Sequence, residues 1–357
     1  MNFPQPLKIA VLVLTLLVAG CAQPRLVMNL ADTGKGVPAK VWPEPPEPPR
    51  YQYVGELTGE ENFRADHGIT FGKVVGALRW LVGLDGYNPN PVVLQRPQSG
   101  VVDEKGRIFV TDSNRQGVYV FDNVAGQLEV WEMARLGYKF ETPIGIALGA
   151  NGEILVADAE LHSVFRLDKK GEPVGDFGRD ILKRPTGLAR DPQRGLVYVA
   201  DTHAHDIKVF SDDGTLLKTI GKRGEGDGEF NFPTHLNFAA DKLYVTDTLN
   251  SRVQIFDTDG KMVQKFGRLG LYVGDMVRPK GVAVDSMGNI YVIESLYDNL
   301  LVFDKQGRTL LGVGGTGKKV GEFYLPTGVW TDRQDRIYIA DMYNGRVTVL
   351  QYLKQTP

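Results

Sequence analysis

Short runs in which apolar and polar residues alternate recur along most of this chain. Three of them are Arg107–Thr111, Leu196–Ala200 and Arg336–Ala340, and Gly, Asp and Asn residues bound each run. Alternation of this kind predicts β-strands that are joined by hairpin turns. The runs belong to six units that together cover roughly residues 95–354. One unit alone could not bury both faces of its small sheet, but six units packed radially could, so the pattern predicts an all-β propeller.

Two positions mark every unit. A proline opens each unit, at intervals of 42 to 48 residues, and these prolines are Pro97, Pro143, Pro185, Pro233, Pro279 and Pro326. An acidic residue closes the second predicted strand of each unit. These acids are Asp112, Asp158, Asp201, Asp247, Glu294 and Asp341.

The fourth unit, Gly221–Gly260, shows the pattern most completely. A glycine-rich run leads into Phe230 and Pro233, and Asn250 and Arg252 follow the closing acid. The sixth unit repeats the pattern with Asn344 and Arg346. These residues resemble the NHL repeat family, and the resemblance implies a six-bladed β-propeller with four-stranded blades. The sixth unit lacks a fourth strand, and we expect the alternating segment Arg50–Leu57 to supply it and to close the ring.

The first 20 residues are predicted to be a lipoprotein signal peptide. Lys8 precedes an apolar run, Ile9–Ala19, that is too short to span a bilayer. The segment Val18–Cys21 resembles a bacterial lipobox, which implies cleavage before Cys21 and a lipid on its sulfur. Because Ala22 follows instead of Asp, the resemblance also implies sorting to the outer membrane, facing the periplasm. A cleaved signal peptide followed by an incidental cysteine is the alternative.

Two segments fall outside the repeats. Residues 21–50 contain five prolines within Trp42–Pro49, which favours an extended tether; a proline-rich recognition ligand is the alternative. Residues 60–94 are a non-repeat insert of the propeller domain, which we assign to residues 51–357. Apolar residues recur there at helical spacing between Phe71 and Val82, so a short amphipathic helix is expected. The helix would either pack on the propeller or contact a membrane or a partner.

Composition and charge narrow the function. The net charge of −2 gives no general attraction to nucleic acid, and the single cysteine allows no internal disulfide. The sequence contains no C-x-x-C-H haem motif and no G-x-S-x-G nucleophile motif. We expect a monomer whose membrane contact is the N-terminal lipid.

The six closing acids are the first candidate site. In a propeller they would lie near one axial opening, where they could bind a ligand or a hard cation such as Ca²⁺. The alternative is structural, because a carboxylate at a strand end accepts hydrogen bonds from the amides of the following turn. Arg184 and Lys280 flank opening prolines at the same end and would suit an anionic ligand.

The histidines are the second candidate. His162, His203, His205 and His235 fall in units two to four, and propeller geometry would bring all four to the same end. Three convergent imidazoles can bind a catalytic Zn²⁺. The comparison family is the peptidyl-α-hydroxyglycine lyases, NHL-like propellers that use zinc bound by histidines. Against a metal site, His203 and His205 alternate along the chain, and turn histidines are commonly solvated.

The sequence therefore predicts a membrane-tethered scaffold in the bacterial cell envelope that binds a protein, a polymer or another ligand. Tyr297 and Tyr343, and Trp80 and Trp131 elsewhere, are candidate contact residues. The alternative function is a zinc-dependent lyase or hydrolase built on the histidines, and a sugar or lactone hydrolase would need clustered acids at the axis.

Overall fold

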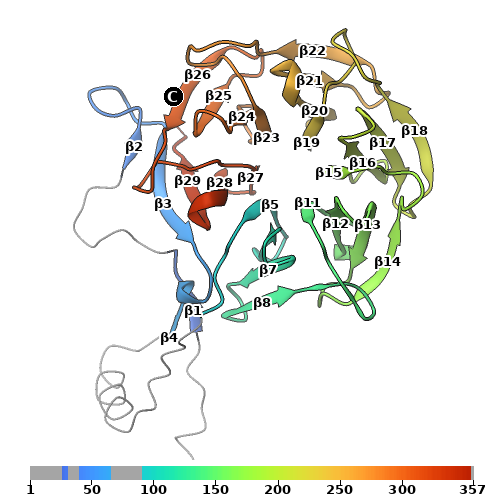
Figure 1. Cartoon of the computed structure of the whole chain (residues 1–357). Coiled ribbons are helices and arrows are strands. Elements are labelled where there is room, and N and C mark those ends of the chain that lie inside the picture. Colours follow the sequence, from blue (N-terminus) through green and yellow to red (C-terminus); the bar gives the residue numbers. More distant parts are fainter. Residues whose placement is uncertain (1–25, 31–39, 66–90, 355–357) are drawn as a thin grey trace, which may run out of the picture.

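The computed structural model describes residues 26–30, 40–65 and 91–354, and these form a six-bladed β-propeller (Figure 1). Each blade is an antiparallel sheet whose strands run outward from the axis in chain order. Blade 1 consists of β5 (Pro97–Val102), β6 (Ile108–Asp112), β7 (Gly117–Asp122) and β8 (Gln127–Trp131). Blade 2 consists of β11 (Pro143–Leu148), β12 (Ile154–Asp158), β13 (Ser163–Leu167) and β14 (Pro173–Phe177). A short hairpin of β9 (Met133–Arg135) and β10 (Tyr138–Lys139) connects these two blades.

The next three blades repeat this order. Blade 3 consists of β15 (Pro185–Asp191), β16 (Leu196–Asp201), β17 (Asp206–Ser211) and β18 (Leu216–Ile220). Blade 4 consists of β19 (Pro233–Ala239), β20 (Lys242–Asp247), β21 (Arg252–Phe256) and β22 (Met262–Phe266). Blade 5 consists of β23 (Pro279–Val284), β24 (Ile290–Glu294), β25 (Asn299–Phe303) and β26 (Thr309–Gly314). The predicted fold class and blade number are confirmed.

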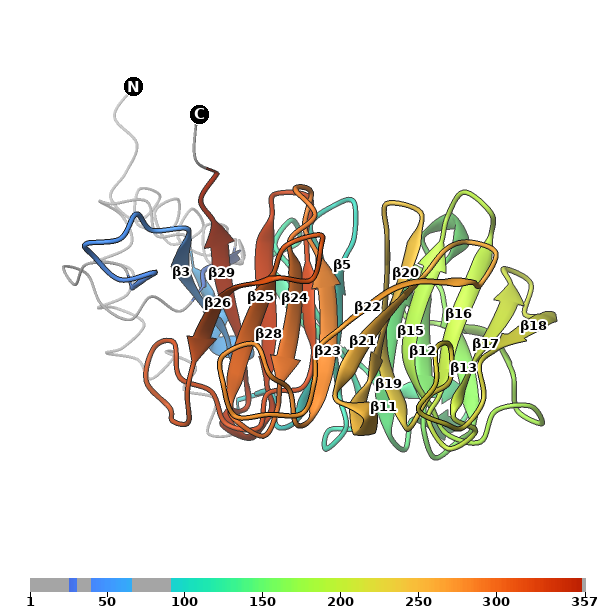
Figure 2. The same ribbon diagram turned by 90° about the horizontal axis from the view of Figure 1, so that it is seen from above.

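The N-terminal strand closes the ring, as predicted. Blade 6 consists of β27 (Val329–Thr331), β28 (Arg336–Asp341), β29 (Arg346–Tyr352) and, from the other end of the chain, β3 (Tyr51–Leu57). Strand β3 pairs antiparallel with β29, from Leu57 opposite Val347 to Tyr51 opposite Tyr352. Figure 2 shows these two strands side by side at one edge of the disc. The pairing covers the outer edge of β29, which would otherwise be open to another chain.

The proline-rich segment departs from the prediction. Strand β2 (Val41–Trp42) pairs with β3, so residues 40–50 fold back on blade 6 instead of extending away from it. Trp42 is buried and packs in the core between blades 5 and 6. The expected extended tether is therefore wrong for this segment. The tryptophan and the pairing of β2 with β3 outweigh the preference of prolines for an extended chain.

A second small sheet packs against the seam between blades 6 and 1. Strand β1 (Leu26–Met28) pairs with β4 (Phe63–Ala65), and a 3₁₀ turn, Glu60–Asn62, precedes β4. The buried Asn62 side chain accepts hydrogen bonds from the amides of Thr58 and Gly59. The signal peptide, Cys21 and the predicted helix of the insert lie outside the described residues. Within the described residues, no helix is long and apolar enough to cross a membrane.

The hydrophobic core is divided among the six seams between blades. Adjacent residues of one strand face opposite seams, as the alternating pattern predicts. Phe109 packs in the seam between blades 1 and 2, whereas its neighbour Val110 packs in the seam between blades 6 and 1. Ile146 and Ala147 divide in the same way between the seams on either side of blade 2. The packed seams hold the six inner strands around a common axis.

Candidate ligand-binding site

The six closing acids stabilise the blades and do not face an open site. All six side chains are fully buried. Asp112 shows the arrangement: one oxygen accepts from the amides of Gln95 and Arg96, 2.6 and 2.9 Å away, and the other accepts from Asn114 and Arg115. The carboxylate thus joins the segment that enters a blade to the turn after its second strand. The other acids, Asp158, Asp201, Asp247, Glu294 and Asp341, accept from backbone amides in the same way. Their proposed role in binding a ligand or Ca²⁺ is therefore corrected to the structural alternative.

The two flanking cations differ from each other. Arg184 forms an ion pair with Glu160, 2.6 Å away, so its charge is already balanced. Lys280 is half-buried on β23, and no ion pair or hydrogen bond to its amine occurs among the described residues. Burial lowers the pKa of Lys280, and nearby Arg278 lowers it further. Of the predicted anion-binding pair, only Lys280 remains free to meet a ligand.

The four histidines do not converge. His162 and His203 are exposed in turns of blades 2 and 3. His205 is buried, and its Nδ1 accepts a hydrogen bond from the Phe232 amide, whose ring lies 4.5 Å away. Burial is the main cause that lowers the pKa of His205, with Arg223 second. His235 lies on β19, the inner strand of blade 4.

No group of three or more His, Cys, Asp or Glu side chains in the described part of the chain is arranged to hold a metal ion. The predicted zinc site is therefore wrong in its geometry. Both His203 and His205 lie near the Phe232 ring, but His203 is exposed and only His205 is buried. His162, His203 and His205 lie in turns that follow second strands, and His235 lies near the opening proline of β19, so all four are at the same end of the propeller, but they do not form a metal-binding group among the described residues.

The predicted aromatic contacts also separate. Trp131 is buried between blades 1 and 2, where it packs against Phe109. Tyr297 and Tyr343 are exposed in turns, and Arg96 lies over the Tyr343 ring. Trp80 lies outside the described residues. Trp131 is therefore a core residue, and the two tyrosines remain surface candidates.

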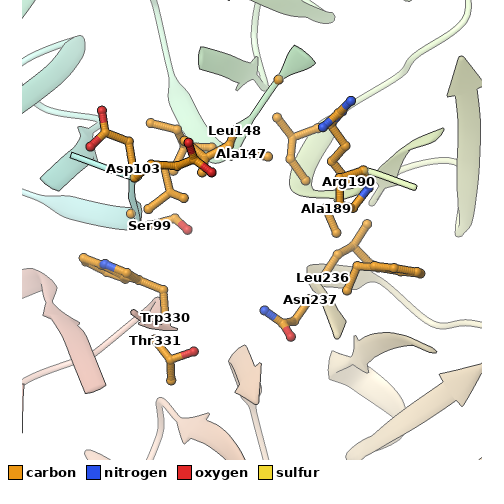
Figure 3. A pocket seen from close by; sticks show the side chains of 18 of the residues that line it. Ser99, Asp103, Ala147, Leu148, Ala189, Arg190, Leu236, Asn237, Trp330 and Thr331 are labelled. Carbon is orange, nitrogen blue, oxygen red and sulfur yellow. The ribbon is translucent and has the colours of Figure 1, made fainter. Parts of the chain in front are cut away.

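A cavity lies on the axis, at the end opposite the closing acids. Its volume is about 880 Å³, and it is lined by the later residues of the inner strands and by the hairpins that follow them (Figure 3). The apolar wall includes Ile146, Leu188, Leu236, Val282 and Val329. From the sequence, we expected the functional site at the end of the channel where the opening prolines and closing acids lie. The cavity lies at the other end, so that expectation is corrected.

One position of each inner strand shapes the cavity, the fourth residue after the opening proline. Blades 2 and 3 place Ala147 and Ala189 there, and the small side chains leave space at the axis. Blades 4 and 6 place Asn237 and Trp330 at the same position, and both line the cavity. At this position of the inner strands, the cavity therefore combines small apolar side chains with an asparagine and a tryptophan from two different blades.

These two side chains have unused hydrogen-bonding groups. The buried Nε1 of Trp330 and the buried Oδ1 of Asn237 have no partner among the described residues. A buried polar atom without a partner is costly, and such atoms are rare in folded proteins. A ligand with an acceptor for the indole N–H and a donor for the amide oxygen would satisfy both.

Trp330 is held in place by its neighbours. Its ring stacks on Tyr338, with centroids 5.6 Å apart and planes 6° apart. On its other side is Gly100 of β5, where an added Cβ would lie 2.3 Å from the indole Cζ2. Only glycine leaves room for the indole at this seam. The tryptophan is therefore fixed before any ligand binds.

Charged residues surround the cavity. Five basic and two acidic residues lie among its lining: Lys105, Arg107, Lys169, Arg190, Arg333, Asp103 and Glu104. Arg107 pairs with Asp103 at 2.8 Å, and Arg333 pairs with Glu104 at 2.7 Å. Arg190 binds Asp212, which lowers the pKa of that carboxyl. The rim has an excess of basic residues and would favour a neutral or anionic ligand over a cationic one.

Sequence reasoning missed Trp330 and Asn237, although the repeat contained a usable signal. When the inner strands are aligned by their opening prolines, the positions equivalent to Trp330 and Asn237 in the other four blades are Val101, Ala147, Ala189 and Ala283. A tryptophan and an asparagine at a position otherwise held by small or aliphatic residues mark a departure from the repeat.

Comparisons with known proteins agree with this architecture. A family profile described as "6-bladed beta-propeller" matches residues 276–353, and one described as "NHL repeat" matches residues 182–210. Human (Homo sapiens) NHL-repeat-containing protein 4 is 31% identical over 110 residues, which are 31% of this chain and 79% of that protein.

Peptidylglycine alpha-amidating monooxygenase of Rattus norvegicus is 32% identical over 112 residues, or 27% of this chain. The chain spans only 12% of the length of that protein. Among solved structures, virginiamycin B lyase from Staphylococcus aureus superposes with a TM-score of 0.53 at 15% identity, covering 72% of this chain and 96% of that one. Identity this low shows a shared fold and nothing about activity.

Proposed function

The chain belongs to the NHL-repeat β-propellers, and from that premise we propose that it is a ligand-binding scaffold whose site is the axial cavity. The observation that carries this proposal is the pair of unpartnered buried atoms, Trp330 Nε1 and Asn237 Oδ1, in a cavity of about 880 Å³. The volume suits a small molecule, or the end group of an envelope polymer. The favoured occupant has an apolar body, one hydrogen-bond acceptor and one donor.

We propose further that the scaffold works in the bacterial envelope, anchored by a lipid on Cys21. The support for the anchor is the apolar run Ile9–Ala19 followed by the lipobox-like segment Val18–Cys21. Acyl chains add about 0.8 kcal/mol of membrane affinity for each buried CH₂. Labelling cells with radioactive palmitate should mark the wild-type protein and leave C21A unmarked. An unlabelled wild-type protein would contradict the anchor without touching the cavity proposal.

A ligand screen tests the cavity. The full chain is screened by thermal shift against a fragment library and against soluble fragments of envelope polymers. Compounds that stabilise the wild type are then titrated against W330F and N237A. We expect affinity to fall at least about tenfold in each variant, because each one removes a hydrogen-bonding group that the ligand would use.

W131F is the matched control, since Trp131 is equally buried but lies in a seam away from the cavity. It should bind each compound as the wild type does. Equal binding by the wild type, W330F and N237A would reject the axial cavity as the site. The catalytic alternative receives no support from the geometry, because the described histidines and acids form no metal-binding group.

A further inference from the structure

The turn between β7 and β8 of blade 1 (Asn123–Gly126) departs from the repeat. Its residues Val124 and Ala125 are apolar and exposed, Val124 to 67%. Polar residues and glycine are usual in such turns, so an apolar tip indicates a surface that meets something other than water. In blades 2 to 5, the equivalent turns carry charged or polar residues, namely Lys169–Lys170, Asp212–Asp213, Thr258–Asp259 and Lys305–Gln306.

Asp122 holds this turn in one shape. Its Oδ1 accepts hydrogen bonds from the amides of Val124 and Ala125, each 2.8 Å away. The Gly126 amide donates to the Asp122 carbonyl at 2.9 Å. The six residues that follow Asp122, from Asn123 to Leu128, carry no charge. The turn therefore presents a fixed, uncharged and apolar tip to the solvent.

The N-terminal strand β1 lies directly against this turn. An added Cβ at Gly126 would lie 1.9 Å from the Leu26 carbonyl oxygen, and β1 contacts β8. Leu26 is exposed, whereas Met28 packs into the core between blades 6 and 1. Figure 1 shows β1 outside the ring of blades. Leu26, Val124 and Ala125 therefore lie together on the rim of the propeller, and we call them the rim patch.

The rim patch lies at the same end of the propeller as the axial cavity. Strand β7 begins after the turn that follows the closing acid Asp112, and it leads to the opposite end, where the chain turns into β8. The cavity also lies opposite the closing acids. A surface that the rim patch touches would therefore lie beside the mouth of the cavity.

The proposed lipid anchor is close to the rim patch in the sequence. Cys21 precedes Leu26 by five residues, which span at most about 18 Å when fully extended. Strand β1 is paired with β4 and packed on the propeller, so these five residues are the whole length of the tether. Acyl chains on Cys21 would lie in the hydrocarbon of the bilayer, and the tether would hold Leu26 close to the headgroups.

We propose that the rim patch rests on the lipid surface of the membrane that holds the Cys21 anchor. This contact rests on the proposed lipid anchor at Cys21. An uncharged apolar turn enters the headgroup region at little cost, whereas the charged turns of blades 2 to 5 would lose hydration there. The short tether makes the contact effectively intramolecular, so a small patch is sufficient. The propeller would meet the membrane at the rim of blade 1, with blade 4 on the far side of the ring.

Quenching by labelled lipids tests the contact. The full lipidated chain carrying V124C is purified, and a fluorophore is attached to the new cysteine, since the lipid on Cys21 blocks the only other thiol. The protein is then placed in phosphatidylethanolamine–phosphatidylglycerol vesicles that contain lipids with a spin label on the headgroup. The fluorescence of V124C should fall at least about twofold, because the rim patch lies among the headgroups.

Two variants are matched controls. D259C places the fluorophore in the equivalent turn of blade 4, and L271C places it at an apolar residue that is 83% exposed in the connector between blades 4 and 5. Neither should be quenched, because both lie across the ring from blade 1. Equal quenching of V124C and L271C would overturn the proposed contact, since any exposed label would then reach the lipid.

Palmitate labelling of Cys21 and flotation of the protein with the vesicles test the anchor separately. A palmitate-labelled protein that floats while V124C stays unquenched would overturn the contact and leave the anchor intact. A protein without palmitate would overturn the anchor and the contact together. Protection of V124C from aqueous iodide without quenching by lipid would also overturn the contact, because a second copy of the chain would then cover the rim patch.

Discussion

Arg252 Nε lies 2.8 Å from Asp247 Oδ2 across the turn between β20 and β21, and both side chains are buried. The other guanidinium nitrogens donate to the carbonyls of Glu225, Gly226 and Glu229 in the glycine-rich connector. Asn250 also donates to Asp247 and to the Gly224 carbonyl. These contacts explain why the repeat combines a glycine-rich run, a closing acid, an asparagine and an arginine. Together they fold the connector against the blade.

Removing the arginine should therefore destabilise blade 4. R252A leaves the Asp247 carboxylate buried without its cationic partner, and we expect the free energy of unfolding to fall by about 3–5 kcal/mol. The measurement is urea denaturation followed by circular dichroism. R333A is the control, because it removes an exposed arginine that pairs with exposed Glu104, and it should change stability by less than about 1 kcal/mol. Equal effects of the two variants would contradict the structural role of the pair.

The fold was largely predictable because each blade repeats the same local rules. A proline begins or shortly precedes the first strand of each blade, and an acid ends the second strand. The alternating segment Arg50–Leu57, which precedes the repeats, supplies the strand that the last blade lacks. The structural role of the acids was also available as an alternative, since Asp112 and its counterparts recur in every unit. A role that every blade shares is a property of the blade, whereas a binding site breaks the repeat.

The binding site was harder to predict because it depends on distances between blades. Trp330 and Asn237 lie 93 residues apart, and no local pattern shows that both face the axis. The burial of Trp42 was not predicted because the prolines beside it dominate the local pattern, while most of the core that it joins comes from blades 5 and 6, between Ala283 and Leu350. The histidines were expected to converge because propeller geometry brings them to the same end, but His162 and His203 are exposed, whereas His205 and His235 are buried.

The position of His235 predicts a distinct dependence of stability on pH. Burial, and secondarily the charge of Lys280, lowers its pKa in the folded state to about 3, below the usual value of 6.5, so the unfolded chain takes up a proton first as the pH falls. The contribution of this lowered pKa to the free energy of unfolding is fully present above the pKa of the unfolded state. It is lost as the pH falls toward the pKa of the folded state. Between roughly pH 7 and pH 4.5, the wild type should lose about 2–3 kcal/mol relative to H235Q.

Urea denaturation of both proteins at several pH values measures this difference. Comparing the two proteins cancels the titration of the other groups, including His205, whose pKa is also lowered. H205Q is a second control, and it should still show the loss of stability at low pH that His235 causes. Parallel stability curves for the wild type and H235Q would show that the pKa of His235 is not lowered by folding.

Gly100 should be intolerant of any side chain. In G100A the new Cβ would lie 2.3 Å from the Trp330 indole, so the ring or β5 must move. We expect a loss of about 1–3 kcal/mol in unfolding free energy, which is typical of overpacking in a core. Displacement of the indole should also change the near-ultraviolet circular dichroism. G175A is the matched control in β14, where an added Cβ meets only the Arg166 side chain, 4.0 Å away, and stability should be kept or slightly raised.

Trp42 tests whether the proline-rich segment belongs to the propeller. Its ring is 8% exposed and packs with the core of blades 5 and 6, and Gly321 leaves room for it, since an added Cβ there would lie 2.3 Å from the indole. W42A should therefore reduce the free energy of unfolding by about 3–5 kcal/mol, the usual cost of truncating a buried tryptophan. L136A removes a side chain that is 93% exposed and should leave stability unchanged. Protease cleavage within residues 40–50 should also become faster in W42A. If residues 40–50 were a free tether, both variants would unfold like the wild type, and the wild type would already be cleaved there at the same rate.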